Sequence, residues 1–92
     1  MIKAFAHRGV ERFFRTGTVR GINPQHADRL SRQLARLSDA SGPDDMNLPG
    51  WHLHPLKGNR AGSWAVSLSG NWRLTFRFDG TDAVAVNYED YH

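Results

Sequence analysis

Residues 63–88, SWAVSLSGNWRLTFRFDGTDAVAVNY, decide the fold of this 92-residue chain. Apolar and polar residues alternate at 63–68 and again at 71–78, a period of two that is typical of half-buried β-strands, and residues 83–88 form a further strand-like run. Gly70 and Gly80 separate the runs within Ser-Gly and Asp-Gly pairs, which favour tight hairpin turns. The stretch therefore predicts an antiparallel meander of three strands.

The residues before the meander have helical spacing. Val10, Phe13 and Phe14 lie at positions i, i+3 and i+4, which predicts a short helix that ends near Gly17. A second helix is predicted between residues 23 and 42, because an Asn-Pro pair favours a helix start and a Gly-Pro pair ends a helix. Its predicted buried stripe consists of Ala27, Leu30, Leu34 and Leu37.

The order of these elements predicts the fold class. Helices come first and strands follow, with further short strands predicted at 2–5 and 51–54. This order indicates an α+β fold in which two helices pack on one face of an antiparallel sheet. The chain length allows one domain, residues 1–92.

The composition narrows the classes of protein. Three Trp and five Phe supply a packed core, and the net charge of +3 with a pI of about 10.0 permits a nucleic-acid partner. The absence of Cys excludes disulfides, thiolate zinc sites and cysteine nucleophiles, and it fits a cytoplasmic location. No apolar run approaches the roughly 18 residues of a membrane span, so no membrane partner is expected.

The alternation also places a polar set of side chains on the sheet face away from the predicted helices. Arg73 and Arg77 are four residues apart in one run, or about 13 Å along a strand. The whole set comprises Asn71, Arg73, Thr75 and Arg77, with His52 and His54 predicted to share one side of a neighbouring strand. A cationic face that carries histidines suits an anionic substrate.

Three groups of polar residues are candidates for chemistry. They are the pair His52 and His54, the terminal cluster Tyr88, Glu89, Asp90, Tyr91 and His92, and the cations Lys57, Arg60, Arg73 and Arg77. The histidine pair allows three interpretations: metal ligands, acid and base catalysts, or hydrogen-bonded side chains at a sheet edge. Since no spacing is diagnostic of a metal site, none is predicted. The cations form either a phosphate site or a solvated surface.

Three blocks of sequence carry a specific resemblance: LHPLKGNRAGSW at 53–64, GNWRLTF at 70–76 and YEDYH at 88–92. In this order they resemble the HigB-type toxins of the RelE superfamily, over essentially the whole chain. The resemblance implies a compact RelE-like microbial RNase fold and an mRNA endonuclease that acts in the A site of the 70S ribosome. It also implies a HigA-type helix-turn-helix antitoxin as partner, with operator DNA reached only through that antitoxin.

The resemblance assigns roles to individual residues. His54, Asp90, Tyr91 and His92 match the family's catalytic positions, and Lys57, Asn71 and Arg73 match positions near the RNA. Asn59 stands where the family often has aspartate, which changes the charge of the loop and affects no catalytic position.

The chemistry of RNA cleavage agrees with these residue types. The 2′-OH of RNA is an internal nucleophile, so the reaction needs a base, an acid and cations that stabilise the phosphorane, and no metal or cofactor is expected. Histidine as a residue type suits acid and base catalysis, so either His54 or His92 could be the base or the acid. Asp90 could accept the proton or orient a histidine, and Tyr91 could stack on a base. Arg73 is the predicted catalytic cation. The remaining predicted RNA-binding residues are Lys57, Arg60, Asn71, His52 and Arg77.

Two other classes of function stay open at this point. One is a non-catalytic RNA- or ribosome-binding module that uses the same face, and the other is a structural partner of a repressor. New ends in translated mRNA would distinguish the nuclease from both.

Overall fold

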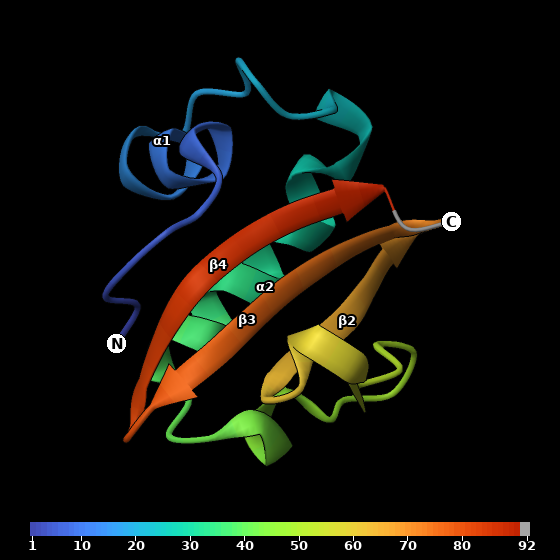
Figure 1. Ribbon diagram of the computed structural model, residues 1–92. Helices are drawn as coiled ribbons and strands as arrows, with labels where there is room; N and C mark the ends of the chain where they lie inside the picture. The colour runs from blue at the N-terminus through green and yellow to red at the C-terminus, as the bar shows by residue number, and fades with distance from the viewer. Residues whose placement is uncertain (91–92) are drawn as a thin grey trace.

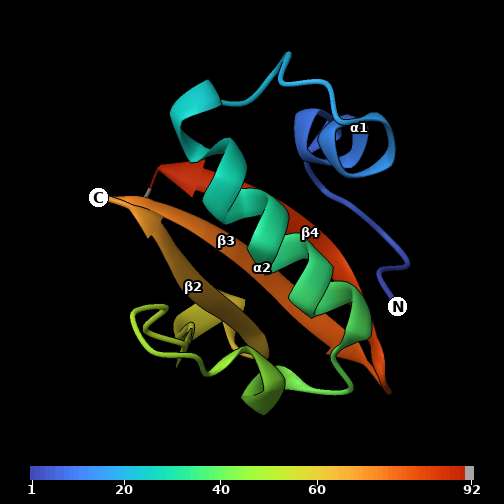
Figure 2. The same ribbon diagram turned by 180° about the vertical axis from the view of Figure 1, so that it is seen from behind.

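A four-stranded antiparallel sheet carries the two helices of the protein on one side. The computed structural model describes residues 1–90. The strands are adjacent in chain order and comprise β1 (His54–Pro55), β2 (Ser63–Ser69), β3 (Trp72–Asp79) and β4 (Asp82–Asp90). The helix α2 (Ala27–Asp39) crosses one face of the sheet, and α1 (Arg8–Thr16) lies beside the outer strand β4 (Figure 1; Figure 2). The predicted α+β fold is confirmed.

The meander of β2, β3 and β4 forms as the sequence predicts. Both pairs of neighbouring strands are antiparallel. Gly70 and Gly80 occupy the two turns with φ angles of 56° and 63°, a left-handed conformation that glycine adopts without a Cβ clash. The last strand continues to Asp90, beyond the predicted run at 83–88.

A histidine side chain caps the start of α1, and a glycine ends it. His7 Nδ1 accepts a hydrogen bond of 3.1 Å from the Val10 amide, and Gly17 ends the helix with a φ of 79° and a 2.9 Å bond from its amide to the Phe13 carbonyl. Burial lowers the pKa of His7, which keeps its ring neutral and its Nδ1 able to accept. The predicted helix end at Gly17 is therefore confirmed.

The second helix starts with a tighter turn than the sequence indicates. The Asn23 side chain caps the 3₁₀ turn η1 (Pro24–His26) by accepting a 3.0 Å bond from the Gln25 amide, and α2 follows directly. Past α2, the segment predicted as loop contains a second 3₁₀ turn, η2 (Pro43–Met46). Within residues 1–90, no helix is long and apolar enough to cross a membrane.

The core lies between α2 and the sheet. Leu30, Leu34 and Leu37 of the predicted stripe are at most 1% exposed, and Leu74 and Phe76 of β3 are fully buried in the same cluster. The stripe is thus confirmed for its three leucines, while Ala27 is only half-buried. The predicted buried face of α1 is less buried than its spacing indicates: Val10 is fully buried, but Phe14 is 37% exposed. Burial of these aliphatic and aromatic side chains is the main stabilising contribution.

The N-terminal segment lines the outer edge of β4. Ile2 and Phe5 form isolated parallel bridges with Ala83 and Val86. The amide of Lys3 donates to the Ala83 carbonyl at 2.8 Å. The strand predicted at 2–5 therefore exists only as bridges, which cover the backbone groups of an edge that would otherwise be open to pairing with another chain.

Two non-glycine residues have left-handed backbones: His52, which lies just before β1, and Ala85, which lies within β4. The Trp51 carbonyl accepts from the Ser67 amide at 2.7 Å, and His54 pairs with Ala65. The chain therefore advances by three residues from Trp51 to His54, whereas the facing part of β2 advances by two residues. His52 (φ 52°) is the extra residue. The prediction of a strand at 51–54 with His52 and His54 on one side is therefore wrong, because β1 begins only at His54 and a bulge before it interrupts the alternation. A similar bulge in β4 includes Ala85, which has the same φ.

A buried aromatic and histidine cluster joins β3 and β4 to the start of the second helix. Tyr88 is 6% exposed, its ring stacks on Trp72 with centroids 4.5 Å apart, and its hydroxyl accepts from the Asn23 amide at 3.3 Å. Burial raises the pKa of Tyr88, so the hydroxyl keeps its proton, and it shares a hydrogen bond with Nδ1 of the buried His26.

Tyr88→Phe should lower the free energy of unfolding by about 1–3 kcal/mol. The phenylalanine ring preserves the stack on Trp72, while the His26 ring nitrogen and the Asn23 amide lose their shared partner inside the protein. Urea unfolding of both proteins measures the difference, with Phe5→Leu as a control for a hydrophobic change near β4. Equal unfolding midpoints for Tyr88→Phe and the parent protein would contradict the prediction.

Candidate functional site

Strand register places His54, Thr75 and the two arginines Arg73 and Arg77 on the sheet face opposite α2, which we call the second face. His54 pairs with Ala65, and Ala65 with Thr75, so these three form one row across the sheet. Arg73 lies in the row of Ser67 on one side of Thr75, and Arg77 lies in the row of Ser63 on the other. The predicted common face of Arg73, Thr75 and Arg77 is confirmed by this register.

A loop covers the middle of the second face. Residues 56–62 include the 3₁₀ turn η3 (Gly58–Arg60), which lies in front of β2 on the side away from α2 (Figure 1). Leu56 is buried, and its amide donates to the Ser63 carbonyl at 2.8 Å. Ala65 is fully buried and Thr75 is 2% exposed. A solvent-exposed platform across the whole face, as the alternation predicts, is therefore wrong for these central positions.

A bidentate ion pair attaches this loop to the far side of the sheet. Arg60 Nη1 and Nη2 donate to the two carboxylate oxygens of Glu89 at 2.9 and 2.6 Å, and the Thr75 hydroxyl donates to Glu89 Oε2 at 2.7 Å. Hydrogen bonds from Arg60 hold the pKa of Glu89 below its ordinary value, against the opposing effect of burial. The charge of Arg60, a predicted RNA-binding residue, is thus largely engaged within the protein.

Sequence reasoning missed the role of Glu89. Glu89 belongs to the titratable terminal cluster, of which only Asp90, Tyr91 and His92 match the family's catalytic positions. The alternation of side chains along the last strand could have identified it. Glu89 pairs with Arg73 and therefore lies on the second face. Tyr91 and His92, both predicted catalytic, lie outside the described residues.

The half-buried His54 has its ring orientation set by the bulge beside it. His54 Nδ1 lies 2.9 Å from the His52 carbonyl oxygen, and a carbonyl can only accept, so Nδ1 carries the proton. Nε2 is then the nitrogen that can exchange a proton with a ligand. His52 itself is exposed, and its backbone, rather than its side chain, makes this contact.

Arg73 points to one end of the sheet. Its Nη1 donates to the carbonyls of Gly70 and Trp72 at 2.9 and 3.0 Å, which keeps the guanidinium at the turn between β2 and β3. Asn71 occupies the same turn, and Asp90 pairs with Trp72 beside it. Arg73, Asn71 and Asp90 therefore lie at the same end of the sheet.

The register also separates some of the predicted residues. Asp90 falls in the row of Trp72, which packs against the α2 side, whereas His54 lies on the second face and on the opposite outer strand. Arg77 lies toward the other end of the sheet, close to Gly62. A Cβ atom added to that glycine would be 3.3 Å from Arg77 Nη2. Lys57 is exposed immediately before η3. The described residues of the predicted site thus lie in three places: the sheet end at 69–73, the second face at His54, and the loop at 56–62.

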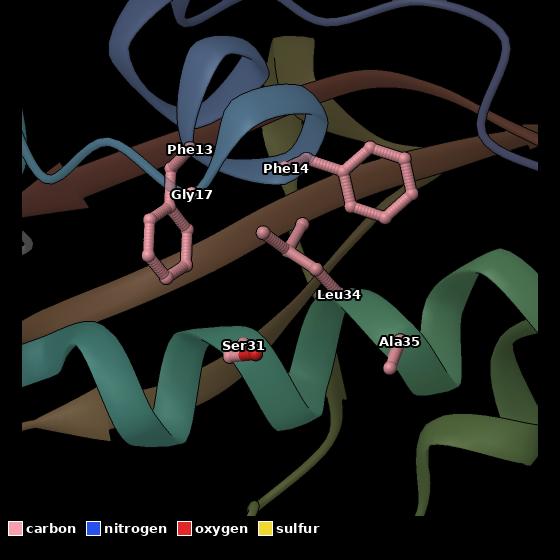
Figure 3. A pocket seen from close by; sticks show the side chains of 6 residues that line it. All are labelled: Phe13, Phe14, Gly17, Ser31, Leu34 and Ala35. Carbon is pink, nitrogen blue, oxygen red and sulfur yellow. The ribbon is translucent and has the colours of Figure 1, made fainter.

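A hollow of the surface lies away from these residues. A hollow of about 330 Å³ lies between the helices, where the Leu34 side chain of α2 points toward α1 between the rings of Phe13 and Phe14 (Figure 3). Of the predicted site residues that lie within 1–90, none lines it. Among residues 1–90, no group of three or more His, Asp and Glu side chains is arranged to hold a metal ion.

Comparisons with known proteins place the chain among bacterial toxins. A model of the HigB-like toxin family, described as "RelE-like toxin of type II toxin-antitoxin system HigB", matches residues 3–92. The curated "Endoribonuclease HigB" of Proteus vulgaris is 41% identical over 92 residues, which cover 100% of both chains. A solved structure, "YoeB/ParE toxin from Agrobacterium tumefaciens", aligns with 97% of this chain and 99% of that chain at 19% identity and a TM-score of 0.46.

Proposed function

Since the chain belongs to the HigB-like toxin family of type II toxin–antitoxin systems, we propose that it is a ribosome-dependent endoribonuclease that cuts translated mRNA in the A site of the 70S ribosome. The full-length identity of 41% to a protein named an endoribonuclease supports the activity. The observation that carries the chemistry is His54, whose Nδ1–H is bound to a backbone carbonyl so that Nε2 is available for proton transfer. Cleavage in this way would stop translation and growth.

The proposed reaction uses the nucleophile of the RNA itself. The 2′-oxygen attacks the adjacent phosphorus, a base takes the 2′ proton, and an acid protonates the 5′-oxygen as it leaves. His54 Nε2 serves as one of these two groups, and Asp90, Tyr91 and His92 supply the other and position the bases. Arg73 stabilises the charge that develops on the phosphorane, because its guanidinium is already fixed at the sheet end.

The same proposal names the partners. Membership of a toxin–antitoxin family entails an antitoxin partner, and we assign a HigA-type helix-turn-helix antitoxin that alone contacts operator DNA. The ribosome and mRNA meet the second face and the sheet end, where Lys57, Asn71 and the exposed His52 contact RNA. These partners place the protein in the cytoplasm.

The ends of the products test the mechanism. Purified protein on programmed ribosomes should leave a 5′-OH on the downstream fragment and a 2′,3′-cyclic phosphate or 3′-phosphate on the upstream fragment, because the 2′-oxygen forms the new bond. Cleavage should survive EDTA kept below the level that strips ribosomal Mg²⁺. The same mRNA without ribosomes should stay intact.

Three outcomes would contradict separate parts of the proposal. Products with 5′-phosphate ends would overturn attack by the 2′-oxygen. Equally rapid cleavage of free mRNA would overturn ribosome dependence. Binding to ribosomes without new mRNA ends would identify a non-catalytic module.

A further inference from the structure

Glu89 is a carboxylate on the face that carries the basic residues. It pairs with Arg73 in the ladder between β3 and β4, and its side chain is 23% exposed. A carboxylate in this place would repel an RNA phosphate unless its charge were balanced. Arg60 balances it with two short hydrogen bonds, and the nearly buried Thr75 adds a third.

The ion pair spans the sheet. Arg60 belongs to the loop that follows β1, and Glu89 belongs to β4; these are the two outer strands in the order β1-β2-β3-β4. Both carboxylate oxygens are used, and one of them also accepts from Thr75. Exposed ion pairs often contribute little to stability, but a bidentate pair with a third buried donor has a defined geometry.

The loop transmits this geometry to Lys57. The Arg60 amide donates to the Lys57 carbonyl at 3.3 Å, and the Ala61 amide donates to the Gly58 carbonyl at 3.1 Å. These bonds form the turn η3, so the backbone of Lys57 is fixed relative to that of Arg60. Holding the Arg60 side chain against β4 therefore also sets the place of Lys57 over the second face.

We propose that Glu89 is a positioning residue, which anchors Arg60 across the sheet and thereby places the Lys57 loop for RNA. This role rests on the proposed function of the second face as an RNA-binding surface. The positioning role and simple charge counting predict opposite effects of removing the Glu89 charge. Removing a negative charge from such a surface should tighten RNA binding by electrostatics alone, whereas loss of an anchor should weaken cleavage.

The test compares Glu89→Gln with Lys57→Ala and with the double variant, in single-turnover cleavage on ribosomes at increasing concentration. Glu89→Gln should lose about tenfold in cleavage efficiency, and the double variant should be no worse than Lys57→Ala, because residues that act through one another have non-additive effects. Glu11→Gln is the matched control, since Glu11 is an exposed carboxylate paired with Arg15 on α1. It should leave cleavage unchanged.

A second measurement tests the anchor without RNA. Amide hydrogen exchange at Arg60 and Ala61 should become faster in Glu89→Gln and in Arg60→Lys, which keeps the charge and loses the planar fork. Unchanged exchange in both variants would overturn the anchor. Faster exchange with unchanged or improved cleavage, or fully additive losses with Lys57→Ala, would overturn the positioning role.

The two proposals fail in different ways. If the parent protein itself leaves mRNA on ribosomes uncut, the proposed function fails, and the exchange result still decides whether Glu89 holds the loop. If Glu89→Gln does not fold, as judged by thermal unfolding, Arg60→Lys carries the same comparisons.

Discussion

Replacing His54 with alanine is expected to slow single-turnover cleavage of mRNA on programmed ribosomes by about 10²–10⁴-fold, the usual contribution of one positioned acid or base. The physical reason is the fixed tautomer of this ring. Its Nδ1–H is bound to the His52 carbonyl, so Nε2 is held ready to take or give a proton. Alanine removes this group and leaves the β1–β2 backbone pairing intact.

His52→Asn is the control for this prediction. The variant keeps the backbone carbonyl that orients His54, and asparagine tolerates the left-handed backbone at this position better than most residues. Its cleavage rate at saturation should fall by no more than a few fold, since only an exposed side chain is lost. Normal cleavage by His54→Ala, or equal losses in the two variants, would exclude His54 as the acid or base.

Arg73→Ala should reduce the same single-turnover rate by about 10²–10³-fold, as expected for one aimed donor to a developing oxyanion. Two backbone carbonyls hold the Arg73 guanidinium at the turn beside Asn71, at the end of the sheet that Asp90 also reaches. A cation that is already in place spends little energy on reorganisation when charge develops on the phosphate. The loss should therefore appear in the rate at saturating ribosomes.

Arg77→Ala is the matched control on the same strand and the same face. Arg77 is exposed and lies against Gly62, away from the turn, and its removal should change the rate by less than about threefold, as for a distant screened charge. Equal losses for Arg73→Ala and Arg77→Ala would identify a diffuse electrostatic surface instead of an aimed cation. Thermal unfolding of both variants separates lost chemistry from lost structure.

The bulge at His52 connects local backbone geometry to the proposed chemistry. An extra residue in an outer strand rotates the following side chains relative to the sheet, and bulges often occur where a side chain is redirected near a site. Here the bulged residue also supplies the carbonyl that holds His54 Nδ1. His52 therefore contributes its backbone carbonyl and His54 contributes its ring, so the two rings do not act as a parallel pair.

The sequence by itself determined the two α-helices and the three-stranded meander of the described residues, and their order. Short-range signals were sufficient for this: alternation through β2 and β3, the turns at Gly70 and Gly80, and the helical spacing of three leucines in α2. Each depends on a few neighbouring residues, because side-chain period and turn conformation are local properties of the backbone. The common face of Arg73 and Arg77 followed from the same period.

Only the tertiary structure decided how the candidate site is assembled. The bulge at His52, the loop across the second face and the pairing of Arg60 with Glu89 join residues up to 29 positions apart. A bulge shifts the register by one residue, which reverses the side that each later residue faces, and nothing in the local pattern marks that shift. Whether Arg60 meets RNA or a carboxylate depends on which strand lies beneath its loop, and that neighbour exists only once the sheet has formed.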